Sequence, residues 1–535
     1  MAEQPRKGAH RVLTTLFDLV ELATERDPDA PAITYRESTS TYGELRRAAL
    51  DVSRGFARLG AERGARVAVF LEKRHELVTT ILGASAAGLA FVPINPVLKV
   101  RQVEHILRDS GATILVTSAD RWRALTATRA EASSLRHVVL VGAATHEEGS
   151  GANIVPWDVL TAPCGPDDES ATAVRSIDLD LGAILYTSGS TGGPKGVALT
   201  HRNLLAGADS VNAYLHNGPD DVLLAVLPFS FDAGLSQLTT GLAAGAHVVL
   251  TNYLLPRDVV KLCAQHGVTG LTCVPPLWRQ IADQEWAEAG RTLRYFANTG
   301  GRLPRTVLDR LRSAFPSAAP FLMYGLTEAF RSTYLEPDEV DRRPDSIGRA
   351  IPNAEILVVA PDGSRTGPGE VGELVHRGAL VALGYWNDPV RTAERFRPVP
   401  GSGAGWGAPE IAVWSGDLVR TDDDGFLYFV GRADEMIKTS GYRVSPTEIE
   451  EVVYATRLVG DAVALGVPDD DLGQSILLVV TAPDGSVVDV ERLLTAVRRE
   501  VPRYMVPSEV VVVDEVPRGP NGKFDRATLR EVHAS

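Results

Sequence analysis

A glycine- and hydroxyl-rich segment constrains this chain more than any other feature. The sequence reads YTSGSTGGPKG from Tyr186 to Gly196, directly after the apolar run LGAILY at 181–186. Glycine tolerates positive φ angles and has no side chain, so such a loop can turn backbone N–H groups toward a phosphate. Thr200 is a suitable N-cap for a helix that begins near His201. This order of strand, loop and helix predicts a nucleotide-binding site.

The end of the loop separates it from the best-known phosphate loop. Pro194 precedes Lys195 and Gly196 follows it, so the segment does not match G-x-x-x-x-G-K-[ST]. No Ser or Thr is placed after the lysine to hold Mg²⁺ as in a P-loop kinase or NTPase. A flexible linker is disfavoured because apolar runs flank the segment closely on both sides.

Short β-branched runs alternate with helical periods through most of the chain. Residues 41–59 and 75–87 have the spacing of helices, whereas ARVAVFLEK, GLAFVPINP, ATILVTS and HVVLVG have the composition of strands. Strands that alternate with helices predict βαβ units and parallel sheets. We therefore expect an α/β fold.

The pattern changes near Ala354. DG and PG pairs now separate short strands, which predicts hairpins in a β-rich subdomain at about 354–431. A compact segment follows, with expected helices at 446–456 and 489–500 and strands between and after them. We place the boundary at 432–435, between a large N-terminal domain (1–433) and a small C-terminal domain (434–535).

Composition excludes several other classes of protein. The net charge is −14, from 54 basic and 68 acidic residues, so the chain lacks the basic footprint of a nucleic-acid-binding protein. Its three cysteines form no C-x-x-C pair and no disulfide framework, which predicts buried reduced thiols and a cytoplasmic location. The N-terminus lacks the apolar core of a signal peptide. No apolar run reaches the length of about 18 residues that a membrane span requires.

Further motifs follow the phosphate loop in a fixed order. They are NTGGRLP at 298–304, MYGLTE at 323–328, WSGD at 414–417, GRADEMIKTSGYRV at 431–444 and NGKFDR at 521–526. Together with the loop, they resemble the motifs of the AMP-forming adenylating ligase superfamily. That superfamily includes acyl- and aryl-CoA synthetases, adenylation domains of peptide synthetases, and luciferases. The resemblance covers essentially the whole chain.

The resemblance implies both a fold and a reaction. The expected N-terminal domain has stacked mixed and parallel sheets with helices, and the small α+β C-terminal domain is mobile. The expected enzyme adenylates a small carboxylic acid with ATP and Mg²⁺ and releases pyrophosphate. It then transfers the acyl group to a pantetheine thiol of CoA or of a separate carrier protein and releases AMP. We expect no nucleic-acid partner.

The motifs supply candidate nucleotide contacts. A carboxylate can hold Mg²⁺, and it can also accept both ribose hydroxyls. By resemblance, Tyr324 packs on the adenine and Thr327 binds the α-phosphate. Glu328 binds Mg²⁺, Asp417 binds the ribose, and Arg432 contacts the ribose or a phosphate.

Lys523 resembles the family's catalytic lysine. An ammonium there can bridge the substrate carboxylate and the α-phosphate, and so stabilise charge as the oxygen attacks. The expected catalytic residues are Lys523, Thr327, Glu328 and Lys195. The resemblance adds the following nucleotide-binding residues: Thr187, Ser188, Gly189, Ser190, Thr191, Gly192, Gly300 and Gly301.

The segment between the domains resembles a hinge and the loop beyond it. Asp434 matches the hinge position, where a change in φ and ψ can swing the small domain. Lys438, Gly441 and Tyr442 would then enter the site for the thioester step. For Lys438, a solvated charged surface is the alternative.

Asp232 is the main clue to the acid. Many fatty-acyl and aryl ligases have a histidine-containing motif here, whereas this chain has Phe231-Asp232, as in amino-acid adenylation domains. By resemblance, Asp232 pairs with a substrate ammonium, since a carboxylate in a partly dry pocket requires a cationic partner. The alternative is an N-cap for the helix that follows.

The same comparison of motifs predicts the wall of the acyl pocket. The expected residues are Ala233, Ser236, Cys273, Thr299, Met323, Arg331 and Ser332. Arg331 is unexpected there, and two hypotheses remain open for it. It pairs with a second acidic group on the substrate, or it points to solvent.

Three alternatives to an amine-activating enzyme remain. The chain is an acyl- or aryl-CoA ligase for a non-amino acid, or a variant that passes the adenylate to a non-thiol acceptor, or a non-catalytic nucleotide-binding protein. Intact Lys195, Glu328, Asp417 and Lys523 argue against the last of these.

Overall fold

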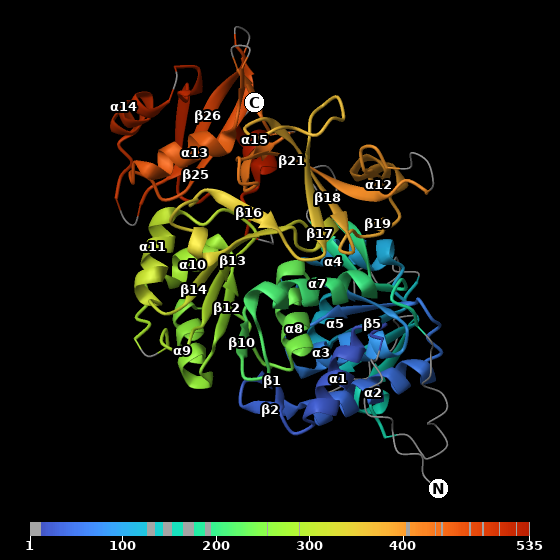
Figure 1. Ribbon diagram of the computed structural model, residues 1–535. Helices are drawn as coiled ribbons and strands as arrows, with labels where there is room; N and C mark the ends of the chain where they lie inside the picture. The colour runs from blue at the N-terminus through green and yellow to red at the C-terminus, as the bar shows by residue number, and fades with distance from the viewer. Residues whose placement is uncertain are drawn as a thin grey trace.

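The computed structural model describes most of the chain, and structural statements below concern these residues. The described ranges are 12–125, 134–142, 152–163, 176–187, 194–253, 255–287, 289–402, 407–433, 435–439, 442–469, 472–483, 486–501, 503–519 and 522–533. Figure 1 shows the N-terminal elements below and the small C-terminal domain above them.

The largest sheet joins parallel and antiparallel parts. In spatial order its strands are β17 (Ala354–Val359), β18 (Val371–Gly378), β21 (Ile411–Thr421), β22 (Leu427–Arg432), β16 (Ser346–Ala350), β15 (Thr333–Leu335), β14 (Ala319–Tyr324), β13 (Tyr295–Asn298), β12 (Gly270–Cys273), β10 (Val222–Ala225), β11 (His247–Leu250), β1 (Pro31–Tyr35) and β2 (Ser38–Thr41), with β20 (Phe396–Pro398) beside β21. Pairing is parallel from β14 to β1 and antiparallel from β14 to β17. The hairpins predicted after Ala354 are therefore confirmed.

A second sheet carries the phosphate-loop strands. Its order is β19 (Gly384–Tyr385), β9 (Lys195–Thr200), β8 (Leu181–Thr187), β4 (Ala90–Pro93), β3 (Arg66–Phe70), β5 (Ile114–Ser118), β6 (His137–Val141) and β7 (Asn153–Pro156). Strands β8 and β9 are antiparallel neighbours, so they hold the two ends of the predicted loop close together.

Helices cover both faces of these sheets. One hydrophobic cluster contains residues of both sheets and of α1 (Phe17–Arg26), α2 (Tyr42–Arg58), α3 (His75–Ala86), α7 (His201–Leu215) and α8 (Asp232–Ala244), so these helices lie between the sheets. The outer faces carry α9 (Pro256–His266), α10 (Pro275–Ile281) and α11 (Arg305–Ala314) on the large sheet, and α4 (Val100–Ser110) and α5 (Ala119–Ala124) on the second. The remaining elements of this part are α6 (Trp157–Leu160), η3 (Thr327–Ala329), η4 (Pro337–Glu339) and α12 (Pro389–Arg395). The expected stack of sheets and helices is confirmed.

Local sequence signals place several of these helices correctly. The expected helices at 41–59 and 75–87 correspond to α2 and α3. Thr200 caps α7 as predicted, because its hydroxyl accepts from the Asn203 N–H at 3.1 Å while Asn203 Oδ1 accepts from the Thr200 N–H at 2.8 Å. Such caps need only residues three apart in the sequence, which explains why they can be recognised before any tertiary contact is known.

The small domain has its own core. Its sheet order is β24 (Tyr442–Val444), β23 (Ile437–Thr439), β26 (Gly473–Thr481) and β25 (Ala462–Asp469), with β27 (Glu509–Val513) beside β26. Helices α13 (Pro446–Ala455) and α14 (Val490–Glu500) pack on one face and α15 (Arg526–His533) on the other, and η5 spans Arg503–Met505. The helices expected at 446–456 and 489–500 are confirmed.

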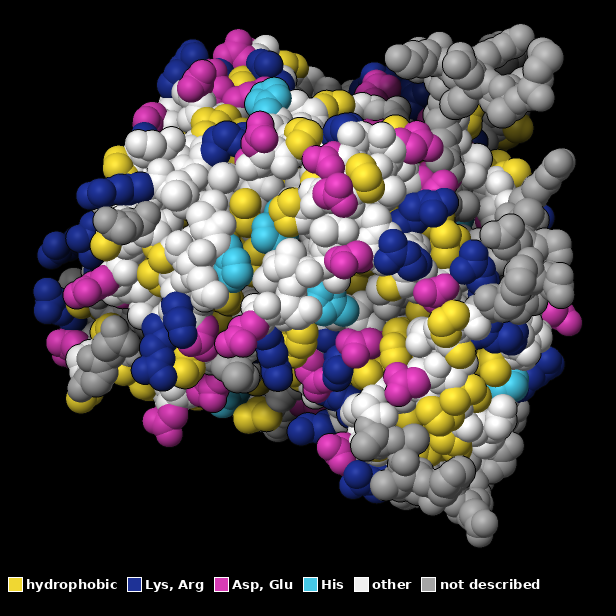
Figure 2. All heavy atoms as spheres, turned by 90° about the horizontal axis from the view of Figure 1, so that it is seen from below, with side chains coloured by type: hydrophobic (Ala, Val, Ile, Leu, Met, Phe, Trp, Pro, Cys, Tyr) yellow, Lys and Arg dark blue, Asp and Glu magenta, His cyan; other side chains and the backbone are white. Residues whose placement is uncertain are grey.

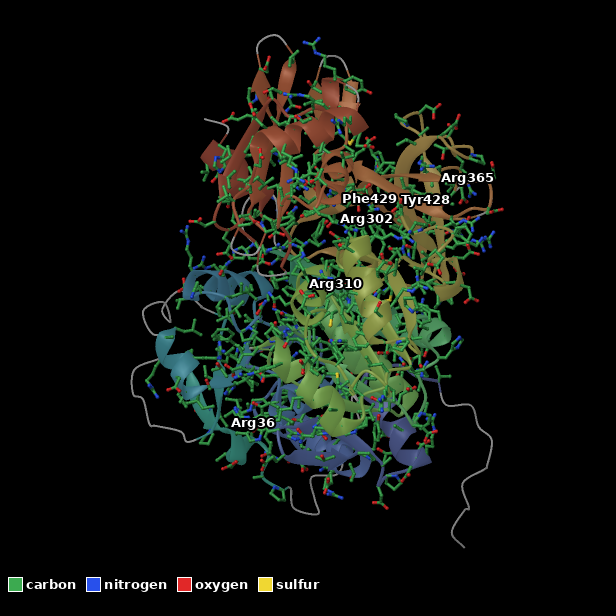
Figure 3. All side chains as sticks on the ribbon, turned by 90° about the vertical axis from the view of Figure 1, so that its left-hand side faces the viewer. Arg36, Arg302, Arg310, Arg365, Tyr428 and Phe429 are labelled. Carbon is green, nitrogen blue, oxygen red and sulfur yellow. The ribbon has the colours of Figure 1, made fainter. Side chains whose placement is uncertain are left out.

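Ion pairs join the small domain to the large one. Arg302 forms one with Glu451 of α13, and Figure 3 shows Arg302 at the level where the two parts meet. Arg279 of α10 forms another with Asp461, which directly precedes β25. These contacts fix the orientation of the small domain in this conformation.

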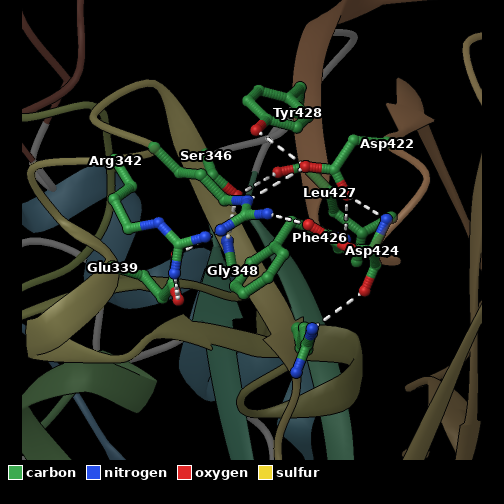
Figure 4. Close-up of polar contacts among 11 residues, drawn as sticks. Glu339, Arg342, Ser346, Gly348, Asp422, Asp424, Phe426, Leu427 and Tyr428 are labelled. Carbon is green, nitrogen blue, oxygen red and sulfur yellow. Dashed lines mark hydrogen bonds and ion pairs between the residues drawn. The ribbon is translucent and has the colours of Figure 1, made fainter.

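A polar cluster anchors the hairpin between β21 and β22 (Figure 4). The Arg343 guanidinium lies 4.1 Å above the Phe426 ring and donates to Asp422 at 3.1 Å. It also pairs with Glu339 and Asp424. The Tyr428 hydroxyl donates to the same Asp422 carboxylate at 3.0 Å. These contacts therefore join the hairpin to the segment around η4.

The surface and the cysteines add two observations. The face seen in Figure 2 mixes charges of both signs among apolar and neutral side chains. Cys263 and Cys273 are buried free thiols, as predicted, and Cys164 lies outside the described residues. No helix within the described ranges is both long and apolar enough to cross a membrane.

Candidate active site

Asp417 forms the centre of the predicted nucleotide site. It lies on β21, opposite Arg432 of β22, and the Arg432 guanidinium is 3.0 Å from its Oδ1. The Tyr324 hydroxyl, at the end of β14, donates to Oδ2 of the same carboxylate. Three residues from three separate motifs are therefore in direct contact.

The electrostatics of Asp417 reflect burial against opposing cations. Burial raises the pKa of its carboxyl group, whereas Arg432, the Tyr324 hydroxyl, Lys523 and Arg395 lower it. Burial also raises the pKa of Tyr324, and the Asp417 charge raises it further. The phenol therefore stays protonated and donates to Oδ2, whereas Oδ1 is paired in charge with Arg432 but accepts no hydrogen bond from the described residues.

Glu328, in η3, has a partner that the sequence motifs did not predict. The Tyr385 hydroxyl, from β19, donates to Glu328 Oε1 at 2.6 Å. The Lys195 ammonium lies 5.6 Å from the centroid of the same tyrosine ring. The lysine that ends the phosphate loop and the predicted Mg²⁺ ligand thus flank one aromatic side chain.

Two arginines of α12 add positive charge at this place. Burial lowers the pKa of Lys195, and so do the charges of Arg391 and Arg395. Arg395 Nη1 also donates to the Trp414 carbonyl at 3.3 Å, three residues before Asp417. Sequence analysis missed both arginines, because ordinary charged residues on a short helix carry no local signal.

Lys523 lies near Asp417, since its charge lowers the pKa of that carboxyl group, and its side chain is exposed. Its carbonyl accepts from the Gly519 N–H at 2.8 Å, which closes a tight turn. A methyl group added at Gly522 would lie 3.7 Å from Pro276, so the turn touches the start of α10. The small domain thus presents Lys523 to the large domain.

Several predicted residues cannot be placed. Residues 188–193, which include Ser188, Gly189, Ser190, Thr191 and Gly192, lie outside the described residues, and so do Asp434 and Gly441. The same holds for the side chains of Lys438 and Tyr442. Thr187 and Lys195 are paired neighbours at the ends of β8 and β9. Gly300 and Gly301 lie against Val274 and Pro275, where a Cβ atom would be 3.2 and 3.3 Å from these residues.

Asp232 and Arg331 contact each other, which changes the interpretation of both. Arg331 Nη1 donates to Asp232 Oδ2 at 2.9 Å, and the Thr327 hydroxyl donates to Oδ1 at 3.2 Å. Arg331 is only 2% exposed, so the hypothesis that it points to solvent is wrong. The N-cap hypothesis for Asp232 is also wrong, because Phe231 is the N-cap of α8 and Asp232 is its first helical residue.

A narrow cavity of about 20 Å³ adjoins Arg331. Ala233, Ser236, Met323 and Arg331 line it, as predicted from the motifs. Its other lining residues are Val211, Leu215, Leu223, Leu224, Gln237, Thr240, Gly270, Thr272 and Tyr295. The other residues predicted for the acyl pocket do not line it: Asp232, Cys273, Thr299 and Ser332. Cys273 belongs to the hydrophobic cluster around α9–α11, because alternate residues of β12 face opposite sides of the sheet.

A strained residue orients Arg331. Phe330 has φ 57° and ψ −56°, which is rare for a residue with a bulky side chain. Its ring packs against α7 at Gly207, where an added Cβ atom would lie 2.4 Å from it. The buried ring holds the backbone in this conformation, and the next side chain, Arg331, enters the cavity wall. Ser332 follows, fully buried against His376.

His376 makes the stability of this region dependent on pH. Its Nδ1 lies 3.0 Å from Ser332 Oγ, and burial lowers its pKa to about 4. An unfolded histidine has a pKa near 6.5, so the unfolded state binds more protons below that pH. We expect the free energy of unfolding to fall as pH drops from 6.5 toward 4, with His376 contributing about 1–2 kcal/mol at pH 5. Urea unfolding at pH 7 and pH 5 measures this loss.

His376→Gln serves as the test variant, because glutamine keeps a polar group beside Ser332 but does not titrate. It should reduce the difference in unfolding free energy between the two pH values. His533→Gln, at the end of α15, is the control and should leave that difference unchanged. An unchanged difference in His376→Gln would contradict the prediction.

Comparison with known proteins agrees with this geometry. The sequence profile described as AMP-binding enzyme matches residues 20–386, and that of the AMP-binding enzyme C-terminal domain matches residues 448–523. The chain belongs to this family. ATP-dependent adenylation of an acid, followed by thioester formation, is thereby confirmed as its class of reaction.

Individual relatives differ in size. This chain is 32% identical to sulfoacetate–CoA ligase of Cupriavidus necator over 97% of its own length and 98% of that protein. It is 31% identical to tyrocidine synthase 3 of Brevibacillus parabrevis over 96% of this chain, but spans only 8% of that synthase. The structure of ATP-bound MatB from Rhodopseudomonas palustris superposes with a TM-score of 0.84 at 26% identity, covering 98% and 99% of the two chains.

Proposed function

We propose that this adenylating enzyme activates a small carboxylic acid at the site between β14, β21 and the Lys523 turn, and transfers it to the thiol of CoA. The observation that carries the proposal is the convergence of Tyr324, Asp417 and Arg432 with Lys523 from the small domain. The full-length match to a CoA ligase favours CoA over a carrier protein. The carrier protein remains the alternative acceptor, because the chain also matches a segment of a peptide synthetase.

The contacts support specific roles in nucleotide binding. We infer that both Asp417 oxygens accept ribose hydroxyls, with Arg432 and Tyr324 holding the carboxylate. Lys195, Arg391 and Arg395 supply positive charge for the phosphates near the loop at 187–194. Within the described residues no group of three or more His, Cys, Asp or Glu side chains could hold a metal ion. A single carboxylate, Glu328, suits Mg²⁺, which takes most of its ligands from phosphates and water.

The adenylation step follows from these positions. The substrate carboxylate attacks the α-phosphorus of ATP, and pyrophosphate leaves. Lys523 stabilises the developing negative charge, while Thr327 can turn its hydroxyl from Asp232 to the α-phosphate. In the second step the thiolate attacks the acyl-adenylate carbonyl and AMP leaves. We place the domain boundary at Asp434, so that the small domain rotates there and withdraws Lys523.

The buried free thiols support the predicted cytoplasmic location.

Exchange of labelled pyrophosphate into ATP tests the first half of the proposal. We expect exchange that depends on an added acid, and AMP rather than ADP as the product once CoA is present. Pantetheine, which lacks the nucleotide of CoA, serves as a second acceptor. An enzyme with a CoA site should use pantetheine less efficiently than CoA, whereas an enzyme with a carrier-protein site should not. Absence of exchange with every acid of a broad panel, or release of ADP, would overturn the proposed function.

A further inference from the structure

We propose that the acid activated here carries a second anionic oxygen group, a carboxylate or a sulfonate, which Arg331 binds. This inference rests on the proposed adenylation activity and adds the class of substrate. It is drawn from the burial and the hydrogen bonds of Arg331 in the cavity wall. The acyl group would lie in the cavity between α7, α8 and β10, with its distal acid group on the guanidinium.

Arg331 has one unused buried donor in the cavity wall. Its Nη1 donates to Asp232 and to the Phe330 carbonyl, at 2.9 and 3.2 Å. Its Nε is buried and has no hydrogen-bond partner among the described residues. A buried donor without an acceptor is costly, and guanidinium presents the Nε–Nη2 edge as a planar fork that matches two oxygens of an anion. An acid group on the substrate would satisfy this edge.

The pairing of Asp232 argues against a substrate ammonium. Its carboxylate already receives hydrogen bonds from Arg331 and Thr327. The predicted amine-binding role of Asp232 therefore loses its main physical support. Asp232 instead holds Arg331 in place on one side.

A plain aliphatic acid is also a poor fit. The cavity has aliphatic walls at Val211, Leu215 and Leu223, but a simple alkyl chain would leave the Arg331 donor unpaired. A site built to hydrogen-bond a substrate group discriminates strongly against an analogue that lacks the group. The aliphatic walls suit the short chain that joins the two acid groups.

Pyrophosphate exchange with four acids of similar length tests the inference. The acids are butanoate, butanedioate, 3-sulfopropanoate and 4-aminobutanoate. We expect at least one of the two dianions to have a kcat/KM about 10-fold or more above that of butanoate, with 4-aminobutanoate no better than butanoate. The faster dianion identifies the distal group as a carboxylate or a sulfonate.

Variants at the pair assign the preference to Arg331. Arg331→Gln should lower the ratio of kcat/KM for the better dianion over butanoate about 10-fold or more, to near 1, as expected for a lost charge-assisted contact. It should raise the relative rate of 4-aminobutanoate, because Asp232 loses its cationic partner. Asp232→Asn should keep the preference for dianions. If Arg331→Gln does not fold, the double variant Arg331→Gln, Asp232→Asn removes both charges and should lose the preference as well.

The failure of this inference differs from failure of the proposed function. Butanoate or 4-aminobutanoate exchanging faster than both dianions would overturn the inference while the ligase activity stands. An unchanged dianion ratio in the variants would do the same. Absence of exchange with all acids would instead overturn the proposed function itself.

Discussion

Lys523→Ala is expected to lower the rate of acid-dependent pyrophosphate exchange about 100- to 1,000-fold, the range found when one preorganised donor to a developing charge is removed. Among the motif residues of the small domain whose side chains the structure describes, Lys523 lies near Asp417, and its side chain is exposed. The variant should therefore fold normally. Exchange kinetics at saturating ATP measure the effect.

The second half-reaction shows whether Lys523 acts only in adenylation or supports the active site as a whole. When synthetic acyl-adenylate and CoA are supplied, Lys523→Ala should form thioester at nearly the wild-type rate, because the lysine acts only in adenylation. Lys261→Ala is a matched control, since this lysine lies exposed on α9. Equal losses in both half-reactions, or no loss of exchange, would contradict the assignment.

Local signals made much of the fold predictable. The α2 and α3 periods, the Thr200 cap and the hairpin turns after Ala354 all depend on residues close together in the sequence. The order of strands within each sheet depends on contacts between distant residues. The sequence alone therefore predicted the class of fold, but not that β1 pairs with β11 or that β8 and β9 are antiparallel.

The site residues that belong to a recognisable motif were predictable from the sequence. Resemblance selected Tyr324, Asp417 and Arg432, which the structure brings together. Tyr385 and Arg395 were missed, because GYWNDPVRTAER has no pattern that distinguishes a site residue from a surface one. The burial of Arg331 was equally hidden, since it depends on the strained Phe330 and on a partner 99 positions away.

A chain of ion pairs explains how the Lys523 turn is held. Asp461 pairs with Arg279 of the large domain and, at 2.7 Å, with Arg518 of its own domain. Arg518 in turn donates to the Gly522 carbonyl at 3.0 Å, directly before Lys523. Asp461 and Arg518 are 18% and 25% exposed in their side chains, so solvent screens these pairs only in part. One carboxylate therefore couples the domain contact to the position of the catalytic turn.

Asp461→Asn is therefore expected to slow adenylation about 30-fold, because it weakens two charge-assisted contacts that together contribute roughly 2 kcal/mol. The thioester half-reaction should be unchanged or faster, since these contacts hold the conformation that the small domain must leave. Pyrophosphate exchange and thioester formation from supplied adenylate measure the two rates.

Asp283→Asn is the control, because Asp283 forms an exposed pair with Arg310 within the large domain. Arg279→Gln should reproduce the effect of Asp461→Asn, and combining the two should add little. An equal fall in both half-reactions would show that Asp461 maintains the fold of the small domain and does not position Lys523 for adenylation.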